Sequence, residues 1–136
     1  AAGKTWDAAC VSMGNPHCVI QWPDEEVPTG NALAAIGPAF EHHPVFPDRT
    51  NTEFVYVYSP DRVKMRVWER GSGETLACGT GACAALAAAH FLGLCPPEVT
   101  ALLPGGSLVL SLDTASGHIR MTGPAVTVFE GEWPGG

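Results

Sequence analysis

The sequence has 136 residues, of which 46% are hydrophobic and 15% are charged, a composition typical of one globular domain with a single core. Its formal net charge of −7 argues against binding to nucleic acid or to an anionic membrane surface. No apolar run approaches the roughly 20 residues of a membrane-spanning helix. We therefore expect one domain over residues 1–136, with neither nucleic acid nor membrane as a partner.

The cysteine pattern indicates reduced thiols. The odd count of five and the absence of a Cys-x-x-Cys spacing fit a cytoplasmic protein better than a disulfide framework or a zinc site. The adjacent His42 and His43 point in different directions, and no nearby Cys or Asp completes a ligand set. We therefore expect no metal site. The cysteines are Cys10, Cys18, Cys78, Cys83 and Cys95.

Short alternating segments bounded by turn residues predict a sheet-rich chain. The first turn lies at Gly14-Asn15-Pro16. Residues 30–41 could form a short helix, broken or begun at Gly37-Pro38. The expected strands are residues 9–13, 18–22, 53–58, 63–68, 99–103, 108–112, 117–122 and 125–130.

Residues 81–92 are nearly all good helix formers, and Gly93 followed by Pro96-Pro97 ends the helix. This segment is apolar on every side, so we expect it to lie buried in the middle of the domain. Many short strands around one apolar helix predict an α+β fold, with a mixed, mainly antiparallel sheet curled around that helix.

Cys78 falls at or just before the first turn of this helix. Free N–H groups and the positive end of the helix dipole lower the pKa of a thiol there and attract an anion. Gly79 and Gly81 would let a ligand approach the backbone. The alternative is that Cys78 is a small buried hydrophobic residue and that the glycines only shape a turn. These residues by themselves leave both interpretations open.

Three segments together resemble the diaminopimelate epimerase family. They are Val11-Ser12-Met13-Gly14-Asn15-Pro16-His17, Phe46-Pro47-Asp48-Arg49-Thr50-Asn51-Thr52-Glu53-Phe54 and Glu69-Arg70-Gly71-Ser72-Gly73-Glu74-Thr75-Leu76-Ala77-Cys78-Gly79-Thr80-Gly81-Ala82. Their order and approximate spacing match the C-terminal half of such an enzyme. The resemblance implies the same fold, because each domain of the family is a sheet curled about a central helix.

The resemblance implies an enzyme that interconverts LL- and meso-2,6-diaminopimelate, in lysine and cell-wall precursor synthesis, without pyridoxal phosphate or another cofactor. Cys78 would be one of two acid/base thiols. The other would belong to an N-terminal domain that this sequence lacks, so we expect the chain alone to be inactive. The implied catalytic residues are Cys78, Glu69 and His17. The implied substrate-binding residues are Asn15, Asn51, Arg70, Gly79 and Thr80.

By the same resemblance, the N–H groups of Gly79 and Thr80 would bind the carboxylate on the reacting carbon, while Asn15, Asn51 and Arg70 would hold the distal end of the substrate. Glu69 would hold the α-amino group or exchange a proton with a thiol, and His17 would serve the other domain's cysteine. Without the resemblance, simpler interpretations exist. Glu69 and Arg70 would be a surface charge pair, and Asn15 and His17 would be ordinary turn residues. Glu74 is expected to be structural, near the start of the Cys78 helix.

The sequence is also compatible with two other functions. A proline racemase-like or related isomerase of the same fold is one alternative, although Glu69-Arg70 and Asn15-Pro16-His17 match the diaminopimelate pattern better. A substrate-binding domain without turnover is another, since the second thiol is missing. The expected partners are the small-molecule substrate and the N-terminal domain. A second copy of the chain could also associate through an exposed sheet face.

Overall fold

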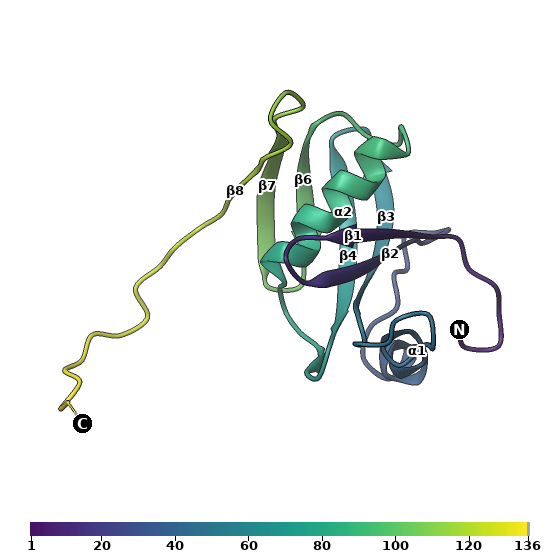
Figure 1. Cartoon of the computed structure of the whole chain (residues 1–136). Helices are drawn as coiled ribbons and strands as arrows, with labels where there is room; N and C mark the ends of the chain where they lie inside the picture. The colour runs from purple at the N-terminus through teal and green to yellow at the C-terminus, as the bar shows by residue number, and fades with distance from the viewer. Residues whose placement is uncertain (136) are drawn as a thin grey trace.

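The computed structural model describes residues 1–135, which form one curled eight-stranded sheet and two helices (Figure 1). In chain order these elements are β1 (Ala8–Ser12), β2 (Pro16–Gln21), α1 (Asn31–Glu41), β3 (Asn51–Ser59), β4 (Arg62–Glu69), β5 (Gly73–Glu74), α2 (Gly79–Phe91), β6 (Glu98–Leu103), β7 (Gly106–Leu112) and β8 (Ile119–Thr122). The strand order is β1-β2-β3-β4-β6-β7-β8, and β5 pairs with β4.

Two parallel strand pairs determine where the helices lie. β2 pairs in parallel with β3, and β4 pairs in parallel with β6, while the other described pairs are antiparallel. A parallel pair needs a crossover connection, and here α1 joins β2 to β3 while α2 joins β4 to β6. This arrangement confirms the predicted α+β class and the mixed, mainly antiparallel sheet.

The larger apolar core lies between α2 and the sheet. Val63, Met65 and Val67 alternate along β4 and are buried in the same cluster as α2, whose central residues are mostly buried alanines. Because alanine is small, the strands can approach the helix closely and curl around it. α2 contacts β1, β2, β3, β6, β7 and β8. Neither helix within residues 1–135 is long and apolar enough to cross a membrane.

A smaller apolar cluster holds α1 against the opposite face of the sheet. Phe54 and Phe40 pack edge to face in this cluster, and Gly37 sits directly on the Trp68 ring. A Cβ at Gly37 would lie 2.2 Å from Trp68 Cδ2, so this close approach requires glycine. α1 continues through Pro38, which corrects the break expected there. The packing of the helix on Trp68 and Phe54 compensates for the hydrogen bond that proline cannot donate.

Glu74 binds the start of α1, not the start of the Cys78 helix as the sequence suggested. One carboxylate oxygen accepts a 2.7 Å hydrogen bond from the Gly30 N–H and the other accepts one of 2.7 Å from the Thr29 hydroxyl. Gly30 is the N-cap of α1 and has no side chain to cap the helix. A carboxylate supplied by β5 therefore takes the position that a capping side chain usually fills.

The buried carboxylate of Glu41 ties the end of α1 to the loop after β4. It accepts hydrogen bonds of 2.8 Å from Trp68 Nε1 and from the Gly71 N–H, and one of 3.3 Å from Arg49. Burial disfavours the charged form, but these donors and the nearby His42 and Arg49 outweigh it, so the pKa of Glu41 lies below its ordinary value.

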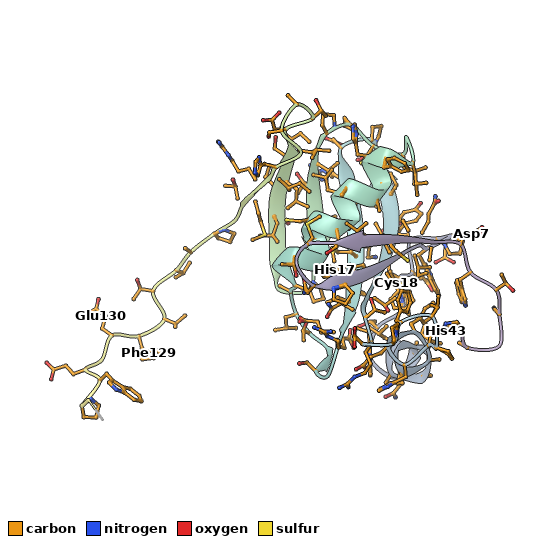
Figure 2. The ribbon with its side chains drawn as sticks, in the orientation of Figure 1. Asp7, His17, Cys18, His43, Phe129 and Glu130 are labelled. Carbon is orange, nitrogen blue, oxygen red and sulfur yellow. The ribbon has the colours of Figure 1, made fainter. Side chains whose placement is uncertain are left out.

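The strand expected at residues 125–130 is wrong. Residues 123–135 lead away from the sheet as an extended segment without strand pairing (Figure 1), and Figure 2 shows Phe129 and Glu130 far from β2. Its large apolar side chains are exposed: Val126, Val128, Phe129 and Trp133. Alternating residues predict a strand only where a neighbouring strand can pair with them.

The substitution Glu41→Gln tests the link to the loop after β4. Because the folded-state pKa is lowered, wild-type Glu41 stabilises the fold above the ordinary carboxyl pKa of about 4.3 and loses this contribution as the pH falls through the folded pKa. The variant should be less stable at pH 7 and should lose less stability on acidification, as measured by urea unfolding at pH 7 and pH 3. The exposed Glu98→Gln is the matched control; identical pH dependence in both variants and the wild type would contradict the assignment.

Candidate functional site

Cys78 is the N-cap of α2, which confirms its placement at the helix start. Its backbone is extended (φ −137°, ψ 108°), and its sulfur accepts a 3.4 Å hydrogen bond from the Gly81 N–H. The Thr80 hydroxyl lies 3.6 Å from the sulfur. The thiol therefore caps its own helix, while Gly79 and Thr80 occupy first-turn positions whose N–H groups lack intrahelical acceptors.

The pKa of Cys78 is raised, and the lowered value expected from its position at the helix start is wrong. Burial has the largest effect, since the residue is only 8% exposed, and the carboxylates of Glu69 and Glu53 raise the pKa further. Hydrogen bonds from Thr80 and Gly81 lower it but do not compensate. At neutral pH the thiol form predominates in this chain.

His17 connects the interior of the sheet to the start of α2. It is buried on β2, where Figure 2 labels it, and its Nδ1 lies 2.7 Å from Glu53 Oε1. Its Nε2 lies 3.0 Å from Asn15 Oδ1. Asn15 Nδ2 in turn donates a 3.3 Å hydrogen bond to the Thr80 hydroxyl. The structure thus brings together four predicted site residues: Asn15, His17, Cys78 and Thr80.

Glu53 belongs to this site, although it is not among the site residues predicted from the sequence. Its side chain is fully buried, and Oε2 has no hydrogen-bond partner among residues 1–135. Burial raises its pKa, against the opposing effect of the hydrogen bond and charge of His17, and nearby Glu69 raises it further. The sequence could have indicated it, because Glu53 is a charged residue on the same strand face as Val55 and Val57, which pack on the core around α2.

Gly81 allows the helix to rest on this buried carboxylate. A Cβ at Gly81 would lie 2.6 Å from Glu53 Oε1 and 3.1 Å from Cys78 Sγ. The absence of a side chain therefore serves a contact within the protein, between the first turn of α2 and Glu53.

Glu69 and Arg70 follow one another at the end of β4 but have different surroundings. The Thr75 hydroxyl donates to the half-buried Glu69 carboxylate. Arg70 is exposed, and its guanidinium donates a 3.0 Å hydrogen bond to the Asp48 carbonyl. No ion pair joins the two side chains in the described part of the chain. The surface charge pair considered from the sequence is therefore not formed.

Asn51 is hydrogen-bonded to the backbone on both sides. Its Nδ2 donates to the Pro16 carbonyl at 2.9 Å, and its Oδ1 accepts from the Arg70 N–H at 3.0 Å. These bonds fasten the start of β2 to the residue after β4. One amide hydrogen and one oxygen lone pair remain for another partner.

A cavity of about 520 Å³ lies beside this linkage, and its lining includes Asn15, His17, Asp48 and Arg70. Cys78 and Glu69 do not line it, so the cavity and the thiol are adjacent regions joined through Asn15. Within residues 1–135, no group of three His, Cys, Asp or Glu side chains could hold a metal ion.

Residues 9–128 match the sequence model of the family described as Diaminopimelate epimerase. The chain is 54% identical over 134 residues to the diaminopimelate epimerase of Synechococcus sp. (strain JA-2-3B'a(2-13)), covering 98% of the chain and 47% of that protein. It is 58% identical over 129 residues to that of Synechococcus elongatus (94% and 44%), and 51% over 132 residues to that of Moorella thermoacetica (97% and 46%). The chain therefore spans about half the length of the curated relatives it matches.

A crystal structure of the Bacillus anthracis phenazine biosynthesis protein of the PhzF family has a similar fold. The TM-score is 0.56 at 18% sequence identity, and the match covers 85% of this chain and 38% of that one. At this identity the likeness concerns the fold alone, and it agrees with the curled α+β architecture.

Burial predicts the order in which the thiols react. Iodoacetamide at pH 7 should label the exposed Cys10 at least about tenfold faster than Cys78, because the pKa of Cys78 is raised, and labelling of Cys78 should accelerate as the pH rises. Cys18, whose pKa burial raises to about 12, should stay unlabelled. Mass spectrometry of each cysteine peptide measures the rates, with the urea-unfolded chain as control. Equal rates for Cys78 and Cys10 would show an activated thiol and contradict the burial argument.

Proposed function

Because the chain belongs to the diaminopimelate epimerase family, we propose that it supplies one of the two acid/base thiols of an enzyme that interconverts LL- and meso-2,6-diaminopimelate. The observation that carries the proposal is Cys78 at the N-cap of α2, beside first-turn N–H groups that lack intrahelical acceptors and the Glu53–His17 pair. The second thiol belongs to the half of the enzyme that the chain does not span.

Epimerisation removes a weakly acidic α-proton from one face of the carbon and returns a proton to the other. Two thiols on opposite faces can do this without moving, one as thiolate base and one as thiol acid. The raised pKa of Cys78 supports the acid role in the resting chain. An ammonium group of the substrate beside Glu69 would oppose the carboxylates and bring the pKa of Cys78 down, which would let it act as base in the reverse direction.

The start of α2 is the proposed site for the carboxylate on the reacting carbon. Gly81 already donates its N–H to the Cys78 sulfur, so Gly79 and Thr80 are the donors that remain for a ligand. Negative charge that develops on the substrate during proton removal would be stabilised by these fixed dipoles.

The remaining candidates surround this centre. Glu69 would hold the α-ammonium group, and His17 would act near the other half's thiol. Arg70 and Asn15, which line the cavity, would bind the distal carboxylate and ammonium. Asn51 would contribute its free N–H or lone pair while it holds the Arg70 backbone.

The N-terminal half of the enzyme is the proposed partner. Cys78 itself is buried, but its neighbours Ala77 and Thr80 are exposed, so a second domain could close over the start of α2. The chemistry needs a reduced Cys78 and no cofactor, which fits a cytoplasmic enzyme. A homodimer formed through exposed apolar side chains is a further expectation.

Two alternatives are weaker. A related isomerase of the same fold would be expected to use a different distal pocket, whereas Arg70 and Asn15 here present donors suited to a carboxylate. A domain that binds without turnover would not require Glu53 and His17 to be buried against the thiol-bearing helix.

Deuterium exchange at the α-carbon of meso-diaminopimelate in D2O tests the proposal. The chain alone should give no exchange, whereas its mixture with the N-terminal half of the Synechococcus elongatus relative should. Cys78→Ala should lower exchange in the mixture at least about a hundredfold, and Cys83→Ala is the matched control that should retain it. Exchange by the chain alone would refute the division of the thiols. Exchange in neither sample would favour a related isomerase or an inert binding domain.

A further inference from the structure

A continuous series of side-chain hydrogen bonds runs from the interior of the sheet to the sulfur of Cys78. Glu53 Oε1 is 2.7 Å from His17 Nδ1, and His17 Nε2 is 3.0 Å from Asn15 Oδ1. Asn15 Nδ2 is 3.3 Å from Thr80 Oγ1, which lies 3.6 Å from Cys78 Sγ. Each link depends on which atom of the pair carries the proton.

The direction of the series follows from the Asn15 amide. Its carbonyl oxygen faces His17 Nε2, so Nε2 must be the donor. Its NH2 group then donates to the Thr80 oxygen, which leaves the Thr80 proton free to point at Cys78 Sγ. If Nε2 were unprotonated, the Asn15 amide would flip so that its NH2 group donates to Nε2. Thr80 would then donate to the Asn15 oxygen instead of the sulfur.

Glu53 determines whether Nε2 keeps its proton. With two protons among Glu53 Oε1, Nδ1 and Nε2, one lies between the carboxyl and Nδ1 and the other stays on Nε2. If the three atoms share only one proton, it lies on Nδ1, hydrogen-bonded to the carboxylate, and Nε2 is unprotonated. A fully buried carboxyl whose second oxygen has no partner among residues 1–135 disfavours the more negative state, so the pair keeps both protons. The raised pKa of Glu53 agrees with this.

We propose that Glu53 is a positioning residue that keeps a proton on His17 Nε2 and thereby turns the Asn15 amide and the Thr80 hydroxyl toward Cys78. When Cys78 gives up its proton, the Thr80 hydroxyl is already oriented to donate to the thiolate. The catalytic consequence rests on the proposed function, but the hydrogen-bond direction does not.

Other ionisable groups act on this series from the neighbouring elements. Glu69 of β4 affects both Glu53 and Cys78. Cys83 of α2 is close enough to Cys78 to be affected by it, and Cys18 of β2 is affected by Glu53 and by Cys10 of β1. These groups are unchanged in every variant below, so differences between variants report on the hydrogen bonds.

The proton positions on His17 can be read directly by NMR. Long-range ¹H–¹⁵N spectra of the imidazole in the wild-type chain at pH 7 should show a protonated Nε2. A bare Nε2 with the proton only on Nδ1 would overturn the proposal, whatever the behaviour of any variant.

The effect on the thiol is measured by a double-mutant cycle. The apparent pKa of Cys78, taken from the pH dependence of its iodoacetamide labelling, should be about one unit higher in Thr80→Val than in Thr80→Ser, which keeps the hydroxyl. With Glu53→Leu the tautomer of His17 is no longer fixed, and this difference should shrink to less than half. Glu53→Gln, whose amide N–H can replace the acid proton at Nδ1, should restore it.

An equal difference in the wild-type and Glu53→Leu backgrounds would show that Glu53 does not act through Thr80. A Glu53→Gln variant that behaves like Glu53→Leu would show that the charge of Glu53, and not its hydrogen bond to His17, changes the pKa of Cys78. Either of these two results overturns the proposal. Circular dichroism confirms that each variant is folded. All these measurements use the chain without substrate, so a result that contradicts the role of Glu53 leaves the epimerase proposal intact. Conversely, an absence of deuterium exchange in the mixture would contradict the epimerase proposal and leave the hydrogen-bond series intact.

Discussion

The arrangement of the site depends on a buried carboxyl–imidazole pair beneath the first turn of α2. Glu53 and His17 are both removed from water, and each is the main partner of the other. Burying such groups is unfavourable unless they are hydrogen-bonded, so their positions are tightly restricted. Because Gly81 lacks a side chain, the helix start lies directly on this pair, and Cys78 is held beside it. The raised pKa of the thiol follows from the same burial.

The topology explains why these residues meet. The parallel pairing of β2 with β3 aligns His17 with Asn51, two residues before Glu53 on the same strand face. The antiparallel pairing of β3 with β4 brings the end of β4, and hence Glu69, to the same end of the sheet. α2 then crosses from β4 to β6 and starts over this end. Glu41 at the end of α1 accepts from Gly71, and Glu74 on β5 accepts from Gly30 at the start of α1, so the two carboxylates hold the segment after β4 against the two ends of this helix.

Much of this could be predicted from sequence because it is local. The apolar run after Cys78, its glycines and the proline stop determine α2, and alternation determines most strands. Three features could not be predicted in this way. The pKa of Cys78 is raised first by burial against other elements and then by the carboxylates of Glu69 and Glu53, which the residues around Cys78 do not specify. Glu74 caps a helix whose N-cap, Gly30, is 44 residues away from it in sequence. The segment 125–130 alternates like a strand, but pairing depends on neighbours that local pattern does not specify. Glu53 carried a readable signal, a charge on the apolar face of its strand.

The most direct test is a comparison of the unfolding free energies of Gly81→Ala and Gly79→Ala. A Cβ at Gly81 would meet the fixed Glu53 carboxyl and the Cys78 sulfur, whereas one at Gly79 would meet the flexible end of Met121 at 3.0 Å. Our account predicts that Gly81→Ala loses about 1–3 kcal/mol and that Gly79→Ala loses less than about 1 kcal/mol. Equal, small losses in both variants would mean that the first turn of α2 does not rest on Glu53, and would contradict the account.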